Sequence, residues 1–137
     1  MTSLQGMSIP VDLPDLAKAL EDFGAGYLMT TTSGGQVKVV TVEPTVAGDT
    51  LHVVRPGKGT VANLAENPAV TLVFPPREPK GFSLLVDGTA AVDGEDVTIS
   101  PATAVLHRPR IHADGPPPPA SAGEQTDSCG NDCAPVT

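Results

Sequence analysis

The 137-residue chain has little of what several classes of protein depend on. It contains no tryptophan, only 3% aromatic residues, and eight lysines and arginines against sixteen aspartates and glutamates, for a formal net charge of −8. Such an acidic chain repels a phosphate backbone, so we expect no nucleic-acid partner. With so few aromatic side chains, a folded core must be built from valine, leucine, alanine and threonine.

Long hydrophobic stretches are missing as well. No run approaches the roughly 20 apolar residues that a membrane span needs. The N-terminus lacks the basic segment and the continuous apolar stretch of a signal peptide. We therefore expect a cytoplasmic protein with no membrane partner.

Only two cysteines are present, Cys129 and Cys133. Two cysteines four residues apart can form a disulfide, act as a redox pair or supply half of a metal site. A structural disulfide is disfavoured in the cytoplasm. With His107 and His112 they would make a two-cysteine, two-histidine set, but the order of the ligands and the spacer match no zinc motif. We expect no metal site, with these four residues as the alternative.

The composition changes toward the C-terminus. Residues 113–137 contain four carboxylates, no lysine or arginine, and the run Pro116–Pro119. Such a segment cannot bury enough apolar surface to fold alone. We expect the residues after Ile111 to contribute little to stability. The predicted organisation is an N-terminal extension over 1–12, a folded domain over 13–112 and an acidic proline-rich tail over 113–137.

The domain reads as a small antiparallel β structure. Asp12, Pro14 and an apolar stripe predict a helix over 13–23. Gly59 and Asn67-Pro68 mark the two ends of a second predicted helix, over 60–66. Neither helix can cover a parallel sheet, whereas an antiparallel barrel removes exposed sheet edges. Strands are predicted over 27–32, 36–46, 50–54, 69–74, 82–92 and 96–106.

A basic, glycine-rich turn, Arg55-Pro56-Gly57-Lys58-Gly59-Thr60, precedes the second predicted helix. Free backbone N–H groups, the helix dipole and nearby cations can together bind an anion. The spacing is not that of a P-loop. The turn is therefore either a phosphate-binding turn or a solvated loop. Lys38 and Thr41, on a valine-rich strand, are either ligand contacts or exposed side chains.

The order of these pieces from Gly35 to Ala91 resembles the flavin-binding split barrels related to pyridoxamine 5′-phosphate oxidase. Two β-runs, the basic turn, the helix containing Asn63-Leu64, and two further β-runs follow in that order. The resemblance implies a mostly β fold, a six-stranded antiparallel split β-barrel with two short helices, followed by the proline-rich tail. It also implies a homodimer with the cofactor between subunits. Two runs that are apolar on both faces, 70–74 and 82–86, favour such an interface.

The resemblance further implies FMN as the cofactor, with the deazaflavin F420 as the alternative, and an oxidoreductase acting on a small-molecule substrate. It assigns the flavin phosphate to the turn and the helix start. Family members often carry a lysine at the position of Thr60 and a small hydroxyl residue two positions earlier, whereas here Lys58 and Thr60 are exchanged. The candidate cofactor-binding residues are Lys38, Thr41, Arg55, Gly57, Lys58, Gly59 and Thr60.

Familiar catalytic motifs are missing. The sequence has no G-x-S-x-G and no H-E-x-x-H, so no catalytic residue is assigned. A flavin enzyme tolerates this, because the cofactor carries the electron chemistry. The alternative is a non-enzymatic split-barrel protein whose cysteine- and histidine-containing tail binds a metal or a partner.

Overall fold

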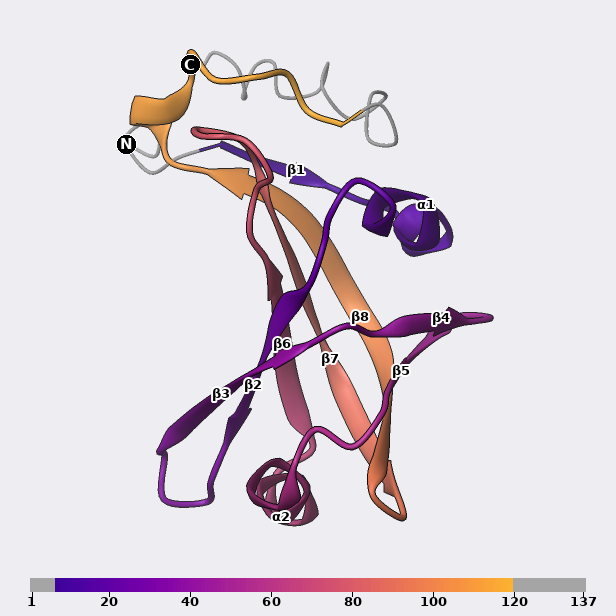
Figure 1. The fold of residues 1–137 in the computed structure, drawn as a ribbon. Coiled ribbons are helices and arrows are strands. Elements are labelled where there is room, and N and C mark those ends of the chain that lie inside the picture. Colours follow the sequence, from indigo (N-terminus) through magenta and orange to yellow (C-terminus); the bar gives the residue numbers. More distant parts are fainter. Residues whose placement is uncertain (1–6, 120–137) are drawn as a thin grey trace. The chain divides into compact units, whose positions relative to one another are not determined.

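The computed structural model describes residues 7–119. Within that range the chain forms eight strands and two α-helices, α1 (Leu16–Leu20) and α2 (Lys58–Glu66), with short 3₁₀ turns at Leu13–Asp15 and Arg110–His112 (Figure 1). The strands are β1 (Met7–Pro10), β2 (Gly26–Thr31), β3 (Val37–Val42), β4 (Thr45–Ala47), β5 (Thr50–Val53), β6 (Ala69–Phe74), β7 (Ser83–Asp93) and β8 (Asp96–Arg108).

The strands form one antiparallel sheet in the order β3-β2-β6-β7-β8-β5-β4, with β1 paired to β8. The sheet is not closed, and its arrangement fits a split barrel. The mostly β class and the two short helices are confirmed, but eight strands replace the expected six. One extra strand is β1. The other arises because the predicted strand 36–46 divides at Pro44, which has no N–H to donate to a ladder.

The chain divides into two compact units. Among the described residues, the first unit consists of 7–24, Phe74–Leu85 and 104–119, and the second of Ala25–Val73 and Val86–Thr103.

In the first unit, β1 lies along the end of β8, where Ile9 pairs with Leu106, and both side chains are buried. The predicted helix 13–23 begins as a 3₁₀ turn containing Pro14 and continues as the five-residue helix α1. Phe23 follows α1 and packs against Phe74, with ring centroids 6.4 Å apart.

In the second unit, β2 and β3 form a hairpin whose Ser-Gly-Gly turn contains Gly35 at φ +93°, a conformation that glycine adopts readily. Alternate residues of the paired strands face the core, which aliphatic side chains such as Leu28, Leu51 and Ile99 fill.

The residues predicted to contact the core or a partner subunit are all buried within this chain. They are Val70, Leu72, Phe82, Leu84 and Val86. No helix within residues 7–119 is long and apolar enough to cross a membrane.

Candidate functional site

The basic turn connects β5 to α2, and two unusual backbone conformations shape it. Arg55 adopts φ +44°, a left-handed conformation that is uncommon outside glycine, and its N–H donates to Asp96 Oδ1 at 3.0 Å. Gly57 adopts φ +122° and ψ 155°, which a residue with a side chain rarely does. Helix α2 begins directly afterwards, at Lys58, two residues earlier than the sequence predicted.

The N-terminus of α2 carries no side-chain cap, because the residue at the N-cap position is Gly57. The first N–H groups of a helix have no acceptor within the helix; the first bond back to the cap is from Val61 N–H to Gly57 O, at 3.1 Å. The helix dipole adds partial positive charge at the same place. The start of α2 therefore has the donors and the potential that an anion requires.

Helix α2 is fastened to the β2–β3 hairpin by side chains. Asn63 Nδ2 donates to Thr30 Oγ1 at 3.1 Å, and Glu66 Oε1 accepts from Ser33 N–H at 3.2 Å. Thr30 pairs across the hairpin with Lys38. These bonds hold the helix over the strand that carries the lysine.

Lys38 consequently lies against the first turn of α2. A Cβ atom added to Gly59 would stand 2.9 Å from Lys38 Cε and 3.3 Å from Lys38 Nζ. Only glycine, which has no Cβ, leaves room at position 59 for the Lys38 side chain as it lies. The structure therefore brings together Lys38 and the helix start, which lie on separate elements of the second unit.

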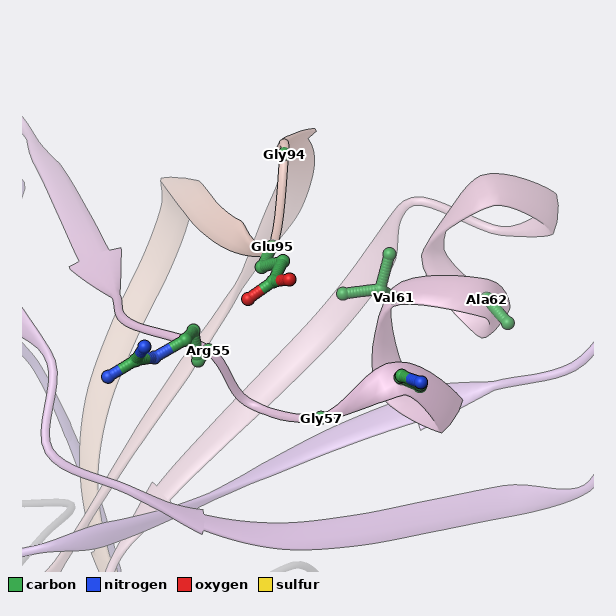
Figure 2. Close-up of a pocket in the computed structure, with 7 residues that line it drawn as sticks. Arg55, Gly57, Val61, Ala62, Gly94 and Glu95 are labelled. Atoms are coloured by element: carbon green, nitrogen blue, oxygen red, sulfur yellow. The ribbon is translucent and has the colours of Figure 1, made fainter.

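Two pockets flank the turn. The one we call the hairpin pocket has a volume of about 350 Å³ and lies between α2 and the turn joining β7 to β8 (Figure 2). The other, the strand pocket, has a volume of about 370 Å³ and lies where β3 and β5 end. Arg55 lines both. The hairpin pocket is lined by Arg55, Gly57, Lys58, Val61, Ala62, Gly94 and Glu95, and the strand pocket by Thr41, Val42, Glu43, Val53, Val54, Arg55 and Pro56.

Comparison with known proteins places this geometry in a family. No protein-family model matches the chain. It is 35% identical over 134 residues to the uncharacterized protein Mb0449c of Mycobacterium bovis, covering 90% of this chain and 92% of that protein. The same values hold for the uncharacterized protein MT0457 of Mycobacterium tuberculosis. The chain belongs to the Mb0449c family.

Solved structures show the fold of this Mb0449c-family chain. An FMN-binding protein from Syntrophomonas wolfei has a TM-score of 0.57 at 16% identity, covering 69% of this chain and 86% of that chain. The FAD binding protein from Mycobacterium smegmatis has a TM-score of 0.55 at 18% identity, covering 75% of this chain and 99% of that chain. HupZ from Group A Streptococcus has a TM-score of 0.56 at 14% identity, covering 68% of this chain and 91% of that chain. The fold is that of the split barrels related to pyridoxamine 5′-phosphate oxidase, as the sequence resemblance implied.

Most of the predicted cofactor-binding residues in the Mb0449c-family chain lie around this one turn. Arg55, Gly57 and Lys58 line the hairpin pocket, Thr41 lines the strand pocket, and Lys38 lies beside Gly59. Thr60 differs, because its side chain is fully buried and its Oγ1 has no partner among the described residues. Thr60 lines neither pocket.

Among residues 7–119 no group of three metal-binding side chains occurs. His107 Nδ1 lies 3.2 Å from Ser8 Oγ, and His112 lies in the last 3₁₀ turn. Cys129 and Cys133 lie outside the described residues.

Sequence reasoning missed three residues at this site. Asn63 and Thr30 join the helix to the hairpin, and Glu95 faces α2 from the β7–β8 turn. The Asp93-Gly94 pair is a signal for the tight turn in which Glu95 lies. Which helix that turn would approach depends on the fold, and no local pattern signals it.

The residues at the helix start fit a phosphate-bearing flavin. A phosphate needs backbone donors and cations at one point. The uncapped N-terminus of α2 supplies the donors, and Lys38 and Lys58 supply the cations. The strand pocket beside it is lined by the polar and charged residues Thr41, Glu43 and Arg55, and among its valines only Val54 is exposed.

Proposed function

We propose that this protein binds a phosphate-bearing flavin, FMN or the deazaflavin F420, and acts as an oxidoreductase on a small molecule. The observation that carries the proposal is the position of Lys38 against the uncapped start of α2. The names of two structural neighbours, an FMN-binding and an FAD binding protein, support a flavin-type cofactor.

Each part of the turn has a distinct role in this proposal. The first N–H groups of α2 donate to the phosphate, and the Lys38 and Lys58 ammonium groups neutralise its charge. Val54, which is 65% exposed and lines the strand pocket, packs against the ring. When bound, the flavin supplies the hydride chemistry. The protein binds and orients it, and no side chain is assigned a proton-transfer role.

The reaction can be tested without knowing the substrate. The purified protein is incubated with FMN or F420, freed of unbound cofactor, reduced in the absence of oxygen, and mixed with small electron acceptors. We expect the flavin or deazaflavin absorption band to stay with the protein and to recover when a suitable acceptor is added. A colourless preparation that retains neither cofactor would overturn the proposal.

A glycine substitution tests the role of Lys38 without removing its charge. Gly59→Ala places a methyl group 2.9 Å from Lys38 Cε, so the flexible end of the lysine must shift. We expect FMN affinity to fall by about tenfold, the size of one charge-assisted hydrogen bond. The fold should survive, because alanine favours helix. Fluorescence titration measures the affinity, and Gly24→Ala, which meets no atom within 4 Å, is the control. An unchanged affinity would show that Lys38 does not contact the phosphate.

We also propose that the protein is a homodimer that uses the outer face of β3. Val37 and Val39 point to the same side of this edge strand and are 62% and 50% exposed. An exposed apolar edge strand is a site for pairing with another chain.

Charged residues on this face should dissociate the dimer. We expect Val37→Lys with Val39→Lys to sediment as a folded monomer at concentrations where the wild type is dimeric. The matched control is Val46→Lys with Val92→Lys, which changes two exposed valines elsewhere on the sheet. A wild-type protein that stays a folded monomer in sedimentation would contradict the proposal.

A further inference from the structure

The turn between β5 and α2 holds its shape against two local preferences of its own sequence. Arg55 has φ +44°, a left-handed conformation in which the Cβ of any residue other than glycine is crowded. Pro56 follows directly, and a residue that precedes proline favours extended backbone with negative φ. The conformation of Arg55 therefore requires a stabilising contact from elsewhere in the chain.

Asp96 supplies that contact, because its Oδ1 accepts the Arg55 N–H at 3.0 Å. Asp96 is the first residue of β8 and directly follows the tight β7–β8 turn, which lies beside the segment carrying Arg55 in Figure 2. The β5–β8 ladder ends at the pair Val53–Val97, so the carboxylate takes an N–H just beyond the point where backbone pairing stops. The Asp96 side chain thus fixes where the chain leaves the sheet and enters the turn.

The position of the start of α2 depends on this turn. The two side-chain bonds that join α2 to the β2–β3 hairpin come from Asn63 and Glu66, in the second half of the helix. The first half, which carries the N–H groups for an anion, continues directly from Gly57. A change of backbone conformation at residue 55 would therefore move the helix start relative to Lys38, while the far end of the helix stayed on the hairpin.

We propose that Asp96 is a positioning residue for the anion site at the start of α2. By accepting the Arg55 N–H it keeps the turn left-handed, and so keeps the helix start against Lys38. Asp96 acts through the backbone and does not contact the ligand. It does so in spite of its charge, because a carboxylate bonded to the turn repels a phosphate bound there. This inference rests on the proposed function only for the identity of the ligand.

The direction of the effect of Asp96→Ala distinguishes this role from simple electrostatics. Removal of a negative charge alone would tighten the binding of FMN. We expect FMN affinity instead to fall by about tenfold, because only molecules with the left-handed turn bind, and loss of the bond leaves roughly one molecule in ten in that state. Asp96→Asn keeps an oxygen acceptor and removes the charge, so it should bind FMN at least as tightly as the wild type. The control Glu95→Ala removes the neighbouring carboxylate and keeps the bond from Asp96.

A double-mutant cycle at position 55 tests the backbone directly. Glycine adopts a positive φ without crowding and alanine does not, whereas both lack the guanidinium group. In the Arg55→Ala background, Asp96→Ala should weaken FMN binding by about tenfold, as in the wild type. In the Arg55→Gly background the same change should weaken it by at most about twofold. Fluorescence titration of the full-length proteins measures the affinities.

The outcomes separate this inference from the function it rests on. If FMN binds, but Asp96→Ala leaves its affinity unchanged or raises it, or weakens it equally in the two backgrounds, the inference is wrong and the proposed function stands. If neither FMN nor F420 binds to any of these proteins, the proposed function fails, and urea unfolding of the same variants decides the role of Asp96. A larger loss of stability in the alanine background than in the glycine background would then support that role, and equal losses would refute it.

Discussion

Replacing Lys38 and Lys58 together by alanine should weaken FMN binding at least about tenfold. The loss should be about a hundredfold or more if both lysines contact the phosphate. Each charge-assisted hydrogen bond contributes about 1.5–3 kcal/mol, and each 1.4 kcal/mol is a factor of about ten in affinity. Lys38 and Lys58 are both exposed, so their removal should not disturb the core. Fluorescence titration of the apo-protein at fixed ionic strength measures the loss.

The control for this experiment keeps the change in net charge the same. Lys18→Ala with Lys80→Ala removes two exposed lysines that belong to the first unit and line neither pocket. We expect this variant to bind FMN within about twofold of the wild type, because neither lysine lines a pocket beside the turn and salt screens exposed charges. Equal affinity in the Lys38/Lys58 variant and the wild type would show that the phosphate is bound elsewhere or that no flavin binds.

Replacing Arg108 by alanine should lower the free energy of unfolding by about 3 kcal/mol, because several charge-assisted hydrogen bonds are lost at once. Its side chain is only 5% exposed. Its NH1 group donates to the backbone oxygens of Lys80 at 3.2 Å and Pro116 at 2.6 Å, and NH2 donates to that of Ala113 at 3.4 Å. The guanidinium also lies 4.1 Å from the centre of the Phe82 ring.

Arg108 remains a cation in spite of its burial. Burial lowers the pKa of its guanidinium, and nearby Asp114 partly offsets this. Arginine nevertheless stays protonated in proteins, so the stabilising contacts should not change across the neutral pH range.

Truncation after His112 should destabilise the protein for the same reason, since it removes two of the three carbonyl acceptors of Arg108. This differs from the sequence-based expectation that the residues after Ile111 contribute little. The chain at Gly115 also packs directly against Lys80, because any side chain at position 115 would overlap the Lys80 backbone.

Urea unfolding measures the effects of both changes. The control Lys80→Ala removes the exposed ion pair between Lys80 Nζ and Asp114, 3.1 Å apart, but keeps the Lys80 carbonyl. It should cost less than about 1 kcal/mol, as exposed pairs do. If Arg108→Ala and the truncated chain unfolded at the wild-type midpoint, the anchoring role of Arg108 would be wrong.

Local signals predicted much of the fold. Strand β6 has the predicted bounds, because Asn67-Pro68 precedes it and Pro75 follows it. The Ser-Gly-Gly turn between β2 and β3 and the Asp93-Gly94 turn between β7 and β8 were likewise readable, since their backbone conformations require those residues.

Long-range contacts account for what the sequence could not predict. Strand β1 has only four residues, and it forms because β8, about a hundred residues later, offers a partner. Burial of Arg108 could not be read locally, because arginine is ordinarily exposed. From the sequence, the turn at 55–60 could be either a phosphate-binding turn or a solvated loop. The approach of Lys38 to Gly59 could not be predicted, because it brings a residue of β3 against α2.

The most direct test of the central claim compares FMN with riboflavin, which has the same ring and no phosphate. If the start of α2 and Lys38 bind the phosphate, calorimetric titration of the apo-protein should show FMN binding at least about tenfold more tightly than riboflavin. That difference should largely disappear in the Lys38→Ala, Lys58→Ala variant. Equal affinities for the two compounds in the wild type, or no binding of either, would contradict the account.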